Sequence, residues 1–200
     1  MAMRQFDINN RICFIFWEKI MKHIILIPGM LGAGCTKVAE ILGKKLNLEC
    51  INTEKIVKRI VTEGRLSYTE LEAMTLSGEI NLEEVIQSIV LDYLSEGNVI
   101  VEGRSAFLVL DRDVDLKIFL FADTEFRVNR IAERRGIALD EAREAVRESD
   151  EDRSGLVKRL YRKSWLDPTL YDMLINTANL KFEAVAEIIR TALENKYEKE

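Results

Sequence analysis

Five short apolar runs stand out in the alternation of hydrophobic and polar positions along the chain. They cover residues 23–28, 49–52, 98–102, 116–121 and 173–176, and each is followed by a helical pattern. Strands that alternate with helices in this way are typical of a parallel sheet. The third and fourth runs are almost wholly apolar, as expected for strands that are covered on both faces. The pattern therefore predicts five parallel strands between layers of helices.

Helical periodicity fills the segments between these strands. Two helical stretches cover residues 54–95 and 124–164, and the second is heavily charged. Their breaks fall near three glycines: Gly64, Gly78 and Gly136. A last amphipathic helix is expected over residues 181–197, with an apolar side made of Phe182, Val185, Ile188, Ile189 and Leu193. The fold class that follows is α/β: a three-layer domain with a five-stranded parallel sheet and a helical excursion before the fifth strand.

The first strand runs into a glycine-rich turn, GMLGAGCT at residues 29–36, which opens a helix. Between a strand and a helix, the pattern G-x-x-x-x-G-K-[ST] binds the phosphates of a nucleotide. Glycines let backbone N–H groups curl around a phosphate, and the helix N-terminus adds positive partial charge. The alternative, a tight turn without a ligand, is disfavoured by three glycines and a threonine at loop spacing. The residues predicted to bind phosphate are Gly29, Gly32, Ala33, Gly34, Cys35, Thr36 and Lys37.

The loop departs from the pattern at the lysine. Cys35 stands in its place, while Thr36 keeps the hydroxyl that would face Mg²⁺. Lys37 lies about 200° around the helix from the lysine position. It therefore points away, although its side chain is long enough to approach the outer phosphates. We expect Cys35 to be a small residue that fills the space of a lysine. The alternative is a nucleophile, because a helix N-terminus lowers the pKa of a thiol.

An acid and an arginine follow the third strand in the run Glu102-Gly103-Arg104. A carboxylate at the end of a buried strand, beside a phosphate loop, can hold Mg²⁺ through water or orient an acceptor. Arg104 offers a planar fork for a phosphate. A strand-end ion pair is the alternative, and the neighbouring loop favours the functional interpretation. Thr36 and Glu102 are thus the predicted metal-binding residues.

The charged stretch 124–164 is rich in arginine. Arg127, Arg130 and Arg134 share one helix face at i+3 and i+4 spacing. Interleaved acids make most of the stretch an ordinary salt-bridged surface. A few of its arginines would close over the phosphates as a lid and supply the charge that the missing lysine does not, since phosphoryl transfer depends mainly on positioning and electrostatic clamping.

Composition narrows the class of protein. A chain of 200 residues fits one domain, and a net charge of −5 argues against a nucleic-acid polymer as partner. The three cysteines, Cys13, Cys35 and Cys50, have no metal-like spacing and indicate reduced thiols in a cytoplasmic protein. A single histidine, His23, argues against histidine-based catalysis. A monomer or a homodimer is expected.

The first 20 residues are expected to be an N-terminal extension outside the core, upstream of a natural start at Met21. Their apolar run at 12–17 is too short to span a bilayer, so no membrane association is predicted. A short helix packed on the surface is the alternative.

The chain contains the glycine loop, the run Glu102-Gly103-Arg104 and the segment WLDPTLYDMLINT at residues 165–177. Together these three features resemble the cytidylate kinase family, in its short archaeal type and its cytidylate kinase-like relatives. The resemblance runs from Met21 to Leu193. Its most specific parts are residues 97–104, 121–136 and 167–177. The charged stretch also matches the lid pattern of the family at Ser149, Asp150, Arg153, Arg159 and Tyr161.

The resemblance implies a P-loop kinase domain over residues 21–200, with a lid at about 137–164, that transfers the γ-phosphate of ATP to CMP or dCMP with Mg²⁺. It implies that residues 29–36 cradle ATP and that Arg104 grips the acceptor phosphate beside Glu102. Lysine-free loops also occur in this family, so Cys35 is compatible with it. The remaining catalytic positions implied are Arg153 and Arg159 from the lid, and Arg130 and Arg134 beside the transferred group.

The acceptor side departs from the family. The family resembles AGEIFRE where this chain has TEKIVKR at residues 53–59, so Glu54 replaces a glycine and Lys58 an arginine. Lysine keeps the charge but loses the bidentate geometry. The substrate-binding residues implied are Lys58, Arg59 and Arg104. Further changes fall at Asn81, Val85 and Gly155. Two alternatives stay open: a catalytically weak nucleotide-binding pseudokinase, and a kinase for another small phosphate acceptor.

Overall fold

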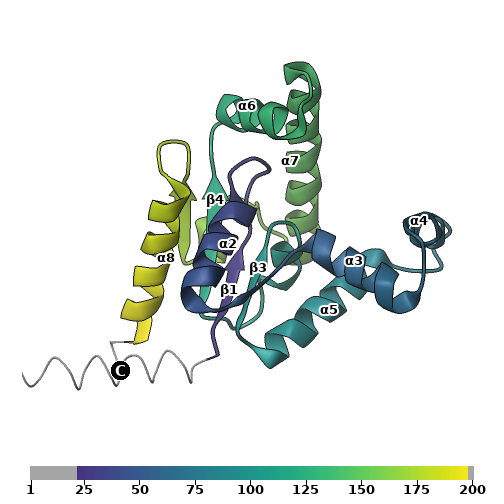
Figure 1. Ribbon diagram of the computed structural model, residues 1–200, viewed down its shortest axis with the longest axis horizontal. Coiled ribbons are helices and arrows are strands. Elements are labelled where there is room, and N and C mark those ends of the chain that lie inside the picture. Colours follow the sequence, from purple (N-terminus) through teal and green to yellow (C-terminus); the bar gives the residue numbers. More distant parts are fainter. Residues whose placement is uncertain (1–21, 198–200) are drawn as a thin grey trace, which may run out of the picture.

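The computed structural model describes residues 22–197, and in it the predicted strands form one parallel sheet (Figure 1). The order across the sheet is β2-β3-β1-β4-β5. The bounds are Ile24–Ile27 for β1, Glu49–Ile51 for β2, Val99–Glu102 for β3, Leu116–Phe121 for β4 and Met173–Asn176 for β5. All neighbouring pairs are parallel, so the predicted sheet is confirmed. The expected N-terminal extension over residues 1–20 lies outside the described residues.

The helices also follow the predicted pattern. They are α2 at Cys35–Leu46, α3 at Thr53–Gly64, α4 at Tyr68–Leu76, α5 at Leu82–Glu96, α6 at Thr124–Arg135, α7 at Leu139–Tyr161 and α8 at Phe182–Tyr197. Two short 3₁₀ helices, η1 at Ser105–Val109 and η2 at Pro168–Leu170, were not predicted. The break at Gly136 is a left-handed cap with φ 65°, whose amide bonds to the carbonyl of Ala132.

Helices cover both faces of the sheet, which is the expected three-layer arrangement (Figure 1). On one face, α2 and α8 pack on Ile25 and Ile118 through side chains such as Val38 and Val185. On the other, α5, η1 and the end of α7 pack around Leu26 and Phe119. The apolar side of α8 is narrower than predicted. Val185, Ile189 and Leu193 are buried, while Ile188 is 41 % exposed, because the stripe in contact with the sheet ends beside it.

The charged excursion consists of α6 and α7, which rise above the end of the sheet where the glycine loop lies (Figure 1). Val128 and Ile131 of α6 pack with Ala142 and Val146 of α7 in a small core of their own. The C-terminal half of α7 belongs to the main core, where Leu156 is buried. Only the first half of α7 therefore projects from the domain. Among the helices of residues 22–197, none is long and apolar enough to cross a membrane.

Candidate active site

The glycine loop is shaped by close contacts that only glycine allows. A Cβ on Gly29 would lie 2.4 Å from the carbonyl oxygen of Leu120 on β4. Gly34, the N-cap of α2, has φ 96°, and a Cβ there would lie 2.5 Å from the ring of Phe182. Because L side chains rarely adopt positive φ, the loop requires glycine at this position.

A cavity of about 620 Å³ opens over this loop and the first turn of α2. We call it the loop cavity. Its volume lies in the range of small-molecule sites, roughly 300–1,000 Å³. Amides in the first turn of a helix have no intrahelical acceptors and favour an anion. The predicted phosphate-binding residues that line the cavity are Gly29, Gly32, Gly34, Cys35, Thr36 and Lys37. Ala33 is buried instead, and its carbonyl accepts a hydrogen bond from Thr177 at 2.8 Å.

The two predicted metal-binding residues both line the loop cavity and contact each other there. The hydroxyl of Thr36 donates a hydrogen bond to Oε1 of Glu102 at 2.9 Å, and Nδ2 of Asn52 donates to the same oxygen at 2.6 Å. This meeting arises because β1 and β3 are neighbours in register, with Ile27 opposite Glu102. Glu102 is 4 % exposed, and its burial raises the pKa of its carboxyl despite these two hydrogen bonds.

Thr36 and Glu102 suit Mg²⁺, a hard cation that takes oxygen ligands. Among the described residues there is no cluster of three or more histidine, cysteine or acidic side chains that would enclose an ion by themselves. Mg²⁺ is usually held by one or two protein oxygens together with waters and substrate phosphates. The donor set at the loop therefore fits an ion that arrives with a nucleotide.

Cys35 is a buried thiol at the start of α2. Burial, aided by the nearby charge of Glu102, raises its pKa to about 12. The thiol is thus protonated at neutral pH, which argues against the nucleophile alternative, because the thiolate is the reactive form. Lys37 lines the cavity with an exposed side chain, whose Nζ lies 3.9 Å from Oε2 of Glu40.

Three predicted arginines line the same loop cavity. Arg130 and Arg134 come from α6, and Arg153 comes from α7. The guanidinium carbon of Arg130 lies 4.3 Å from the centre of the Phe182 ring, close enough for a cation–π contact. The structure therefore gathers side chains from two helices of the charged excursion around the glycine loop.

A second cavity, of about 860 Å³, lies beside α7 and is lined by Arg104, Arg135, Arg153 and Arg159. We call it the arginine cavity; Arg153 lines both cavities. Arg104 is paired with Asp152, its Nη1 lying 3.3 Å from Oδ2 of the acid. Nη2 of Arg159 lies 2.6 Å from Oε1 of Glu83 on α5.

Lys58 and Arg59 are not brought to these cavities. Both are exposed on α3, and neither lines the loop cavity or the arginine cavity. Nε of Arg59 lies 2.8 Å from Oε1 of Glu63, and its guanidinium lies 5.4 Å from the centre of the Tyr93 ring. Their predicted contact with an acceptor stays a prediction.

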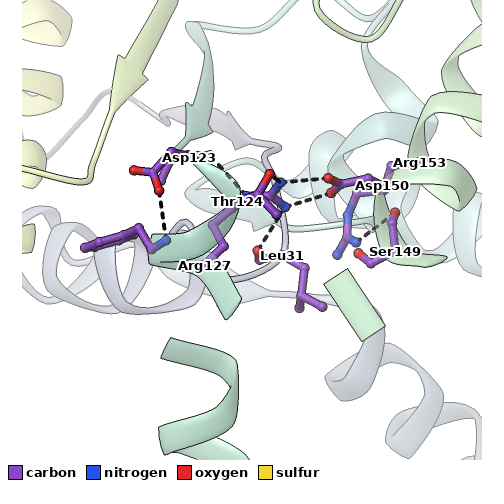
Figure 2. A network of polar contacts seen from close by, with 9 residues as sticks. Leu31, Asp123, Thr124, Arg127, Ser149, Asp150 and Arg153 are labelled. Carbon is purple, nitrogen blue, oxygen red and sulfur yellow. Dashed lines mark hydrogen bonds and ion pairs between the residues drawn. The ribbon is translucent and has the colours of Figure 1, made fainter. Parts of the chain in front are cut away.

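Sequence reasoning did not assign three residues that the structure places at the site. Asn52 holds Glu102, and its position at the end of the second apolar run is a signal that could have found it, since the carboxyl ends of parallel strands meet at one edge. Phe182 was assigned only to an apolar helix side. Arg127 was noted for its spacing, yet it is 3 % exposed and bonds to both Leu31 of the loop and Asp150 of α7 (Figure 2).

Comparisons with known proteins identify the family and the fold. The sequence pattern of the cytidylate kinase-like family matches residues 24–179. A cytidylate kinase of Ignicoccus hospitalis is 31% identical over 85% of this chain and 98% of its own length. One from Archaeoglobus fulgidus is 32% identical over 86% of this chain and 95% of its own. Shikimate kinase from Bacteroides thetaiotaomicron has a TM-score of 0.61 at 18% identity, over 87% of this chain and 99% of that one. This last likeness concerns the P-loop kinase fold alone.

Proposed function

Because the chain belongs to the cytidylate kinase-like family, we propose that it is a nucleoside monophosphate kinase that transfers the γ-phosphoryl group of ATP to CMP or dCMP. The observation that carries the proposal is the contact of Thr36 and Glu102 beneath the glycine loop. A hydroxyl and a carboxylate at this place are the donors that a nucleotide-bound Mg²⁺ takes.

The loop cavity would hold the triphosphate of ATP. Backbone N–H groups of the loop and the start of α2 face the phosphates, and Arg130, Arg134 and Arg153 add positive charge at the cavity wall. Mg²⁺ held by Thr36 and Glu102 would neutralise charge on the outer phosphates. Asn52 keeps the carboxylate of Glu102 oriented toward the hydroxyl of Thr36.

The arginine cavity would hold the phosphate of the acceptor. Arg104 and Arg159 present guanidinium groups there, and Arg153 stands at the wall shared with the loop cavity. An oxygen of the acceptor phosphate would attack the γ-phosphorus of ATP, and the bond to the β-phosphate oxygen would break to release ADP. Positive groups on both sides of the transferred group lower the barrier, because they stabilise charge that is spread over its oxygens. A cytoplasmic location, supported by the free thiols of Cys35 and Cys50, is part of the proposal.

The test is an assay of ADP release by the full chain with ATP and Mg²⁺, run in parallel with CMP, dCMP, UMP and AMP. Products are identified by anion-exchange chromatography. We expect CDP and dCDP, with the other two acceptors used at least tenfold less efficiently. ATP binding without turnover would support the pseudokinase alternative. Turnover only with an acceptor that is not a nucleotide would support the other alternative, a kinase for another small phosphate acceptor.

A further inference from the structure

Arg127 is a buried arginine that joins three parts of the molecule (Figure 2). Its Nε donates to the carbonyl of Ala122, at the end of β4, at 3.1 Å, and its Nη1 lies 3.4 Å from the carbonyl of Leu31 in the glycine loop. Nη1 and Nη2 also donate to the two carboxylate oxygens of Asp150 on α7, at 2.9 and 2.8 Å. One side chain of α6 thus holds the loop on one side and α7 on the other.

This connection has little freedom to move. Bidentate bonds between arginine and a carboxylate fix the orientation of both groups and are among the stronger hydrogen bonds in proteins. The backbone of Arg127 also lies against the loop, since a Cβ on Gly32 would come within 3.0 Å of its carbonyl oxygen. A buried charge that loses its partner is costly, so the pair resists opening.

Arg153 lies three residues after Asp150, on the same side of α7. Its Nη1 donates to the carbonyl of Ser149 at 3.2 Å, and it lines the loop cavity together with Cys35. The buried Nε of Arg153 has no hydrogen-bond partner within residues 22–197. The guanidinium of Arg153 is therefore not fully satisfied by hydrogen bonds within the described part of the protein.

We propose that Arg127 is a positioning residue, which ties Asp150 to the glycine loop and thereby holds Arg153 at Cys35, so that α7 supplies the cation that the loop itself lacks. The inference rests on the proposed binding of the ATP phosphates. It does not depend on which acceptor receives the phosphoryl group.

The test is a double-mutant cycle between Asp150→Asn and Arg153→Gln. Asp150→Asn keeps the side-chain volume and leaves Arg127 its carbonyl acceptors, so the fold is expected to persist. Inorganic tripolyphosphate, titrated calorimetrically without acceptor, is the probe. Loss of a charged hydrogen bond in Arg153→Gln should weaken binding about tenfold. Loss of positioning in Asp150→Asn should weaken it about fivefold. The double variant should bind no more weakly than Arg153→Gln.

Arg143→Gln is the matched control. Arg143 also links α7 to α6 through a bidentate pair, with Glu125 at 2.5 and 2.9 Å, but both side chains are exposed and neither lines the loop cavity. Its loss should change tripolyphosphate binding less than twofold. Cys35→Lys in the Asp150→Asn background provides a cation from the loop itself. This lysine should restore tripolyphosphate binding. It would not do so if Asp150→Asn merely damaged the structure.

Additive losses in the double variant would overturn the inference, as would unchanged binding in Asp150→Asn or a wild-type chain that fails to bind tripolyphosphate. Where Asp150→Asn cannot be purified in folded form, Asp150→Glu, which displaces the carboxylate by one methylene, replaces it in the same cycle. A wild-type chain that binds tripolyphosphate with the predicted cycle but does not phosphorylate CMP would contradict the proposed function alone. Phosphorylation of CMP with an additive cycle would contradict this inference alone.

Discussion

The loop cavity and the arginine cavity differ in how their charged side chains are held. At the loop cavity, Glu102 is 4 % exposed and bonded to Thr36 and Asn52. At the arginine cavity, the side chains of the pair Arg104 and Asp152 are 45% and 65% exposed. Exposed ion pairs contribute only about 0–1 kcal/mol and exchange readily for another anion. We therefore infer that the loop cavity is preformed for ATP, whereas in the arginine cavity the acceptor phosphate replaces Asp152 as the partner of Arg104.

The largest effect is expected for Glu102→Gln, which keeps the shape of the side chain but removes the charge beside Thr36. Changes next to a metal typically cost 10- to 100-fold in activity, so we expect kcat for phosphorylation of CMP to fall about 100-fold. Glu40→Gln is the control, because Glu40 is an exposed glutamate that lines the same cavity near its mouth. It should change kcat less than about twofold. A Glu102→Gln enzyme with the kcat of the wild type would show that the loop cavity is not preformed for the metal.

Arg104→Ala is expected to have the next largest effect. It removes a charged contact worth about 1.5–3 kcal/mol, and so should lower kcat/KM for CMP at least tenfold while the KM for ATP changes little. Arg112→Ala is the control, since Arg112 is an exposed arginine paired with Asp111 at 3.6 Å and lines neither cavity. Unchanged kinetics in Arg104→Ala would show that this residue does not bind the acceptor, and would contradict the role given to the arginine cavity.

The buried carboxyl of Glu102 should also make the free energy of unfolding depend on pH. Burial raises the pKa of its carboxyl above the ordinary value of 4.5. The folded state therefore binds this proton more tightly than the unfolded state does, and the ionised carboxylate costs stability at pH 7. Glu102→Gln should have the larger free energy of unfolding at pH 7, and its advantage should shrink as the pH falls through the raised pKa toward 4.5. Denaturant unfolding at several pH values measures this; an advantage that is the same at every pH would contradict it.

The smallest expected effect belongs to Asp152→Asn. This change removes the acid that competes with the acceptor phosphate for Arg104. The pair is exposed, so its loss should lower the KM for CMP only about twofold and leave the KM for ATP unchanged. An increase in the KM for CMP would show that Asp152 assists acceptor binding and is not displaced by the acceptor phosphate.

Most of the fold could be predicted from the sequence. Strand and helix periodicities are local, and the predicted strands over 116–121 and 173–176 match β4 and β5 without any shift. The meeting of Thr36 and Glu102 was also predictable, because residues after neighbouring parallel strands gather at one edge of the sheet.

The role of Arg127 was not predictable in the same way. Its partner Asp150 lies 23 residues further along the chain. The family resemblance singled out Asp150, but neither the resemblance nor local spacing indicates that Asp150 pairs with Arg127. The spacing that suggested an exposed face of α6 does not reveal that its first turn packs on Gly32. For Lys58 and Arg59, the family pattern suggested contact with an acceptor. The tertiary structure places both on the exposed side of α3, and this contact stays a prediction.

The most direct test of this difference between the two cavities is a crystal structure with Mg²⁺, a non-hydrolysable ATP analogue and CMP. We expect the triphosphate in the loop cavity, Mg²⁺ beside Thr36 and Glu102 with little change in their positions, and the phosphate of CMP on Arg104 in place of Asp152. A triphosphate bound elsewhere, or a CMP phosphate bound while Arg104 stays paired with Asp152, would contradict it.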